Sequence, residues 1–113
     1  MKRLAALLLV AALASPAAAE SRGTRIAMAV ALIDVVQDHC EGRYRIDEHV
    51  KALLFKNVHE YDIAGLASIL SKPLNSFYED FAYQVKQGRD AFCRQAPDVA
   101  ASTGYRVILA GGG

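Results

Sequence analysis

Apolar residues recur at steps of three and four along residues 24–40, the spacing of one face of an α-helix. Thr24 is a suitable N-cap residue and Gly42 a C-terminal breaker, so we predict a helix from Thr24 to about Cys40. Its main stripe comprises Ile26, Ala29, Ile33, Val36 and Cys40, widened by Met28, Leu32 and Val35. The small and polar face comprises Ala27, Ala31, Asp34 and Asp38. So broad an apolar arc predicts a central helix with neighbours on more than one side.

A second helix is predicted to begin at Asp47. An aspartate caps free backbone amides, and Glu48 then lies in the first turn, where the helix dipole favours an anion. The apolar stripe of this helix comprises Val50, Leu53, Leu54, Val58 and Tyr61. The side chains expected to face water are those of Lys51, Lys56 and His59.

Two further helices are predicted downstream. Asp62 is expected to cap a short third helix, which stops near Lys72 because Pro73 disfavours helical geometry at the preceding residue. Ser76 and Glu79 have the spacing of a capping box, which predicts the start of a fourth helix. The inward residues of the fourth helix are expected to be Phe77, Phe81, Val85 and Phe92.

The end of the fourth helix and the segment after it are less regular. Gly88 costs a helix about 1 kcal/mol relative to alanine, and two interpretations stay open: a close helix crossing, or a break after which Asp90 caps a final turn through Cys93. Either way, we expect the helix to end before Pro97. Residues 102–113 are predicted to be a flexible or docked C-terminal tail, because their β-prone run at 105–109 is isolated.

The first 19 residues have the pattern of a secretory signal peptide. Lys2 and Arg3 precede an apolar run at 4–14, and small residues occupy 17–19. The apolar run is shorter than the about 20 residues that span a bilayer. We therefore predict cleavage between Ala19 and Glu20, a periplasmic or secreted mature protein, and no stable membrane anchor after cleavage.

Removal of this leader changes the charge balance. The chain has 13 Lys and Arg and 12 Asp and Glu, which gives a formal net charge of +1. Lys2 and Arg3 leave with the leader, so 11 basic and 12 acidic residues remain and the net charge becomes −1. A nearly neutral chain lacks the basic footprint of a nucleic-acid-binding protein, so no nucleic-acid partner is expected. Residues 20–101 are predicted to form a single helical domain.

Cys40 and Cys93 are the only cysteines of the chain. In an oxidising compartment they are expected to form a disulfide, whose loop length corresponds to about 4 kcal/mol of stabilisation. No C-x-x-C motif supports redox catalysis or haem attachment. Both cysteines are placed near the C-terminal ends of the first and last helices, which a strict up-down-up-down bundle would separate. We therefore predict an all-α fold, a compact, irregular three- to four-helix bundle stapled by one disulfide, in which the short third helix is a connector.

The histidines and carboxylates do not form a recognisable chemical site. His39, His49 and His59 lack the short spacing that places two metal ligands on one helix face. Adjacent acidic residues at 47–48 and 79–80 are explained by capping. We predict no catalytic, cofactor-binding or metal-binding residues, no cofactor and no enzyme activity.

Aromatic residues provide the remaining signal. Tyr78 and Tyr83 lie off the main stripe of the predicted fourth helix, and tyrosine suits interfaces, so these two residues are predicted to contact a partner. Ordinary core packing is the alternative explanation for the aromatic residues as a set. We expect the protein to act by binding a partner protein or a second copy of itself.

The layout of a leader, a short helical chain and one cysteine pair is similar to that of small acid-stress chaperones of the bacterial periplasm. This similarity covers the layout and the two cysteines, and it implies a stress-related or chaperone-like role. Protonation of the histidines and carboxylates in acid is compatible with that role. The alternatives are a small-ligand-binding or metal-binding module, and an enzyme inhibitor or immunity-type protein.

Overall fold

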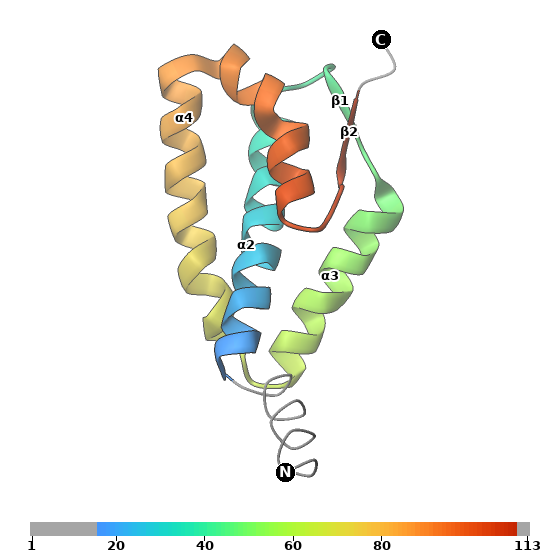
Figure 1. Ribbon diagram of the computed structural model, residues 1–113, viewed down its shortest axis with the longest axis vertical. Helices are drawn as coiled ribbons and strands as arrows, with labels where there is room; N and C mark the ends of the chain where they lie inside the picture. Colours follow the sequence, from blue (N-terminus) through green and yellow to red (C-terminus); the bar gives the residue numbers. More distant parts are fainter. Residues whose placement is uncertain (1–15, 111–113) are drawn as a thin grey trace, which may run out of the picture.

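The computed structural model describes residues 16–110, so most of the predicted leader and the last three glycines lie outside the described residues (Figure 1). The elements of this part of the chain follow in the order α2 (Pro16–His39), β1 (Tyr44–Ile46), α3 (Glu48–Ile63), α4 (Ala67–Ser102) and β2 (Ile108–Ala110). The described chain is therefore mostly helical, as predicted. The expected cleavage site between Ala19 and Glu20 falls in the first turns of α2.

Helix α2 is the central helix that the apolar arc predicts, and every residue of its main stripe is buried. It begins at Pro16 in the described chain, so Thr24 lies inside the helix and not at its N-cap. Ala27 and Ala31, which were predicted on the small and polar face, are 2% and 0% exposed because other helices cover that side too. The helix ends at His39, and Gly42 follows in the left-handed region with a φ of 82°.

Helix α3 begins where the sequence predicts. The carboxylate of Asp47 accepts hydrogen bonds from the backbone N–H groups of His49 and Val50. The buried face of α3 is narrower than predicted, because α3 is an outer helix that contacts its neighbours along one line of side chains. Leu53, predicted in the apolar stripe, is half exposed, whereas Asn57 is buried and its amide donates a hydrogen bond to the Tyr105 hydroxyl.

The third and fourth predicted helices are one helix, α4. Helix α3 continues past Asp62 to Ile63, and α4 begins at Ala67 with no side-chain cap, so neither Asp62 nor Ser76 starts a helix. Pro73 lies inside α4. An internal proline costs a helix about 3 kcal/mol, which burial of α4 side chains in the core outweighs. The buried residues of α4 are Leu70, Phe81, Phe92, Cys93, Ala96 and Ala100.

Gly88 divides α4 into a first arm (67–87) and a second arm (89–102), which run in opposite directions (Figure 1). Its φ of −178° and ψ of 93° are extended, so the break is the correct one of the two interpretations. The helix then resumes and passes Pro97 to end at Ser102, contrary to the expected stop before Pro97.

The predicted disulfide joins α2 to the second arm. Cys40 and Cys93 are bonded, and their Cα atoms are 5.6 Å apart. Because the second arm continues to Ser102, Cys93 lies near the beginning of this arm and not near the end of the last helix. The end of α2 and the beginning of the second arm share one pole of the molecule (Figure 1). The helical segments therefore alternate in direction along the chain. Among residues 16–110, the short third helix that was predicted as a connector is not a separate helix but part of α4.

A two-stranded antiparallel sheet anchors the C-terminal segment. Arg45 of β1 is opposite Leu109 of β2, and the N–H of Asp47 donates to the carbonyl of Val107 at 2.8 Å. Val107 and Ile108 are 0% and 4% exposed. The segment predicted as a tail is thus packed as far as Ala110, and its β-prone run contributes a strand because residues 44–46 supply a partner.

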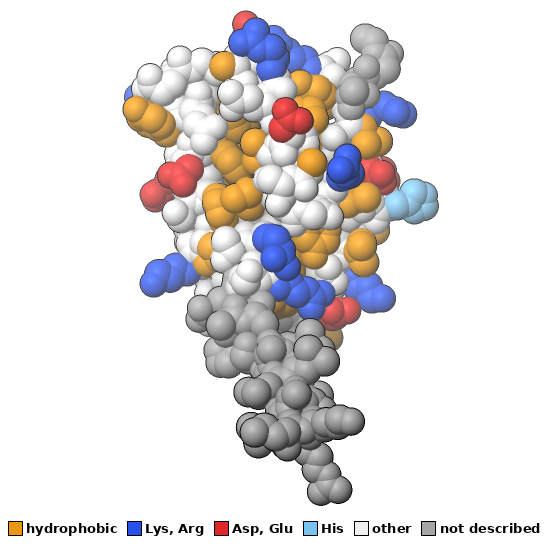
Figure 2. Space-filling model, viewed as in Figure 1, with side chains coloured by type: hydrophobic (Ala, Val, Ile, Leu, Met, Phe, Trp, Pro, Cys, Tyr) orange, Lys and Arg blue, Asp and Glu red, His pale blue; other side chains and the backbone are white. Residues whose placement is uncertain are grey.

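Charge is spread over the surface without one dominant sign. On the face shown in Figure 2, Lys and Arg lie mainly towards the two ends of the molecule, and hydrophobic side chains are visible between the helices. The exposed large hydrophobic residues are Leu53, Phe55, Ile63, Leu66 and Tyr83.

Candidate functional site

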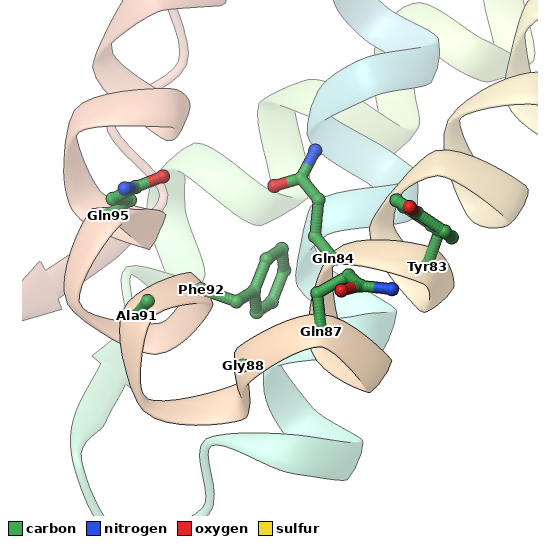
Figure 3. A pocket seen from close by; sticks show the side chains of 7 residues that line it. All are labelled: Tyr83, Gln84, Gln87, Gly88, Ala91, Phe92 and Gln95. Carbon is green, nitrogen blue, oxygen red and sulfur yellow. The ribbon is translucent and has the colours of Figure 1, made fainter.

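A shallow cleft of about 240 Å³ lies at the bend of α4, between its two arms (Figure 3). Gly88 turns the chain back, and side chains on either side of the bend are thereby opposed across the cleft. The lining residues are Tyr83, Gln84 and Gln87 of the first arm, Gly88 at the bend, and Ala91, Phe92 and Gln95 of the second arm.

The cleft combines aromatic rings with uncharged amides. The ring of Phe92 points into the space between the arms and forms an apolar floor, with only 3% of the residue exposed (Figure 3). Tyr83 stands at the rim and is 63% exposed. Three glutamine side chains complete the lining, each with donor and acceptor atoms. The lining residues are uncharged at neutral pH, and the phenol of Tyr83 is the one titratable group among them.

The floor of the cleft is continuous with the core. The Phe92 ring centroid is 5.7 Å from that of Phe81, which is 6.0 Å from that of Phe77. Contacts at these distances stabilise aromatic pairs. The floor is therefore fixed by packing before any partner arrives, which lowers the entropic cost of binding.

The two tyrosines predicted to contact a partner occupy different surroundings. They are five residues apart on one helix, which separates their directions by about 140°. Tyr83 lines the cleft, whereas Tyr78 is partly buried against the core and its hydroxyl donates a hydrogen bond to the Asp34 carboxylate. Burial, and then this bond to Asp34, raises the pKa of Tyr78 to about 12. The structure does not bring Tyr78 and Tyr83 into one patch.

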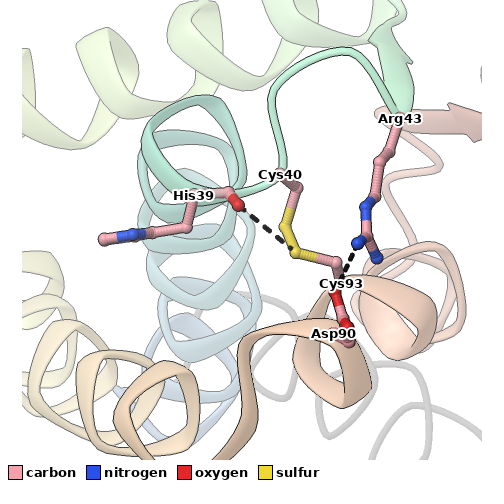
Figure 4. A network of polar contacts seen from close by, with 5 residues as sticks. All are labelled: His39, Cys40, Arg43, Asp90 and Cys93. Atoms are coloured by element: carbon pink, nitrogen blue, oxygen red, sulfur yellow. Dashed lines mark hydrogen bonds and ion pairs between the residues drawn. A yellow bond between two sulfur atoms is a disulfide. The ribbon is translucent and has the colours of Figure 1, made fainter.

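A second cluster, of polar contacts around the disulfide, stabilises the contact between the end of α2 and α4 (Figure 4). The Arg43 guanidinium donates to the Asp90 carboxylate, and this bond, with the charge of Arg43, holds the pKa of Asp90 below its usual range. The Cys93 Sγ lies 3.6 Å from the His39 carbonyl oxygen. Cys40 and Cys93 are 2% and 0% exposed. The cluster ties the turn after α2 to the second arm and leaves no accessible sulfur.

The three histidines considered as metal ligands are dispersed. His39, His49 and His59 are exposed, on α2 and α3. Within residues 16–110, no group of three or more His, Cys, Asp or Glu side chains is placed to hold a metal ion. No helix in this range is long and apolar enough to cross a membrane.

The glutamines of the cleft were missed from the sequence. Amides are common on exposed helix faces, and Gln84, Gln87 and Gln95 become neighbours only after the chain folds back at Gly88. The available signal was the placement of these three glutamines on both sides of a helix-breaking glycine, with Tyr83 beside them.

Comparisons with protein-family models, with curated proteins and with solved structures give no match. A function for this chain therefore rests on the chemistry of its own surface.

Proposed function

We propose that the protein is a small extracytoplasmic binding protein, which holds a segment of a partner protein in the cleft at the bend of α4. The uncharged cleft itself carries this proposal, because it presents three glutamine amides around the Phe92 floor with Tyr83 at its rim. Amides pair with both the N–H and the C=O groups of an extended backbone. Exposed tyrosine is among the residues that dominate binding energy at protein interfaces.

The size of the cleft favours a protein partner over a small ligand. Pockets that enclose small molecules have volumes of about 300–1,000 Å³ and bury most of the ligand. The cleft holds about 240 Å³ and is open along its length. A shallow site of this kind suits a chain segment that passes over it.

The compartment is proposed from two features that agree. Residues 1–19 have the pattern of a secretory leader, and the only two cysteines are paired, as is usual in an oxidising compartment. Intact-mass measurement of the exported protein tests this: we expect a chain starting at Glu20 and lacking two hydrogens, and an uncleaved chain would contradict it.

The cleft is tested by partner retention from an extract of the same compartment. We expect the immobilised mature protein and its Asn75→Ala variant to retain the same partner, because Asn75 is exposed on α4 away from the cleft. Tyr83→Ala and Gln87→Ala should each weaken retention, with Tyr83→Ala about tenfold weaker in affinity. Equal retention by all four proteins would overturn the proposal. A low-mass adduct that disappears in Tyr83→Ala would favour a small-ligand module instead.

A chaperone-like role is the more specific form of the proposal. The amides of the cleft do not titrate, so its chemistry is the same in acid and at neutral pH. We expect the mature protein to suppress aggregation of an unfolded client at pH 3 and at pH 7, and Tyr83→Ala to be less effective at both. If the protein suppressed aggregation at neither pH, the chaperone-like role would be excluded, and binding of a folded partner would remain.

A further inference from the structure

The outward face of α3 is a second surface, separate from the cleft in α4. Helix α3 lies at the edge of the molecule in Figure 1, and no other described element covers its outer side. Phe55 and Ile63 on this face are 44% and 72% exposed. With Ala52 and His59 they form a stripe at steps of three and four, the spacing of a helix–helix contact.

Charges flank this stripe in an ordered way. Lys51 and Asp62 lie along one edge of the stripe, and Lys56 and Glu60 lie along the other, from the 100° rotation per residue. On each edge the lysine precedes the acid along α3. Among the described residues, Lys51, Lys56 and Asp62 form no ion pair within their own chain, and Glu60 has only an exposed pair with Arg22 at 3.9 Å.

We infer that α3 is a self-association surface, on which two copies of this chain pair through antiparallel α3 helices related by a two-fold axis. With the axis midway between Phe55 and His59, each Lys51 lies at the level of Asp62 of the other copy. Lys56 lies two residues from the level of Glu60 of the other copy and equally two residues from the level of that copy's Lys56, so this edge contributes little net attraction. The pairing of opposite charges is thus carried by Lys51 and Asp62, which meet twice across the two-fold axis, whereas a parallel arrangement would bring Asp62 within two residues of the level of Glu60 of the other copy. This charge complementarity selects a second copy as the occupant.

The apolar centre of the pair follows from the same geometry. Phe55 packs beside His59 of the other copy, and Ile63 packs over the small side chain of Ala52. The inner side of Phe55 lines a narrow apolar cavity of about 70 Å³ with residues of α2 and α4. An aromatic side chain surrounded by a polar rim is a usual composition of a protein interface.

The contact is limited in size. Helix α3 has 16 residues and is about 24 Å long, so the pair buries less than a standard interface. We therefore expect a reversible dimer, with a dissociation constant of about 10 µM. The dimer does not rest on the function proposed for the cleft, because α3 contributes none of the cleft's lining residues.

Sedimentation velocity over a concentration series tests the dimer, with a matched pair of apolar variants. Phe55→Ser should be monomeric at 100 µM, on the order of ten times the expected dissociation constant. Leu53→Ser should dimerise like the parent, because Leu53 is equally exposed on α3 but points away from the stripe. A chain that is monomeric at 500 µM, about fifty times that constant, would overturn the inference and leave the face to another protein.

A charge-reversal cycle tests the antiparallel register. Lys51→Glu and Asp62→Lys should each weaken dimerisation about three- to tenfold, since each change affects two symmetry-related pairs. The double variant Lys51→Glu/Asp62→Lys should recover the parent's dissociation constant. A dimer that tolerates each single reversal, or a double variant weaker than both, would show that the copies pair in another way.

Discussion

Tyr78 links two helices through one side chain. Its ring packs against the core from α4, and its hydroxyl donates to Asp34 on α2, 44 residues away in sequence. Asp34 was predicted on a polar face and is exposed, but the sequence pattern of α2 contains no sign of its partner. The bond keeps the first arm of α4 in register with α2.

Burial of Tyr78, together with its bond to Asp34, makes the stability of the protein depend on pH in the alkaline range. The pKa of Tyr78 is raised to about 12, against about 10 for an unfolded tyrosine, so the native state holds the proton more tightly. Its contribution to stability is full below about pH 10 and is lost as the pH rises through about 12. In urea denaturation, we expect Tyr78→Phe to be less stable than the parent at pH 7, by up to about 1 kcal/mol, and the two to converge above pH 10. Parallel stability curves would contradict this.

At the scale of single elements, two helical glycines have opposite roles. Gly23 of α2 is where another helix approaches closely: a Cβ there would lie 2.8 Å from Ile69 Cγ2 and 3.3 Å from Leu70 Cδ2. Gly88 of α4 has extended backbone geometry, and a Cβ there would meet only Ala91, at 3.8 Å. The close crossing considered for Gly88 therefore occurs at Gly23.

Substitution of the two glycines should separate these roles. We expect Gly23→Val to lower the free energy of unfolding by about 1–3 kcal/mol, because the core has no room for the added atoms. Gly88→Ala should be neutral or stabilising by up to about 1 kcal/mol, since it restricts the unfolded chain without strain in the native one. Both are measured by urea denaturation. Comparable destabilisation by Gly88→Ala would mean that the bend requires glycine.

The C-terminal strand is an integral part of the fold, and its burial can be tested at Val107. Val107→Ala should lower the free energy of unfolding by about 2 kcal/mol, because the side chain is fully buried. The neighbouring exposed residue serves as the control, and Arg106→Ala should change stability by less than about 0.5 kcal/mol. If the two variants behaved alike, the segment would act as a flexible tail, which is one of the two forms that the sequence predicts.

At the scale of the whole molecule, the disulfide connects the end of α2 to the beginning of the second arm. The bridged cysteines are 53 residues apart in sequence. Replacement of both by alanine should lower the free energy of unfolding by about 4 kcal/mol, because the unfolded chain loses its constraint. The variant should keep the far-ultraviolet circular dichroism of the parent at low denaturant. A loss below about 1 kcal/mol would show that the constraint is compensated elsewhere.

The predictions that hold depend on short segments of sequence. Asp47 starts α3 because its carboxylate reaches N–H groups two and three residues ahead. The buried stripe of α2 follows from a regular spacing of apolar residues. The cysteine pair is the only intramolecular pairing available.

The predictions that fail concern competition between local and distant contacts. Pro73 and Ser76 are local helix-stop and helix-start signals, yet α4 runs through both because Leu70 and Phe81 are buried in the core on either side. Leu53 is exposed because α3 contacts its neighbours along a narrow line. The spacing of apolar residues in α3 does not reveal how narrow this line is. Of the residues that line the candidate cleft, only Tyr83 was singled out from the sequence as a partner contact, and that contact stays a prediction; the glutamines were not singled out.

The amino-acid sequence alone was sufficient for the helical class, the central helix, the cap at Asp47 and the cysteine pairing, because each depends on neighbouring residues or on a single available partner. Tertiary structure decided the continuity of α4, the reversal at Gly88, the pairing of β1 with β2 and the assembly of the cleft. These features depend on side chains far apart in sequence, whose joint burial or hydrogen bonding outweighs local preferences of about 1–3 kcal/mol.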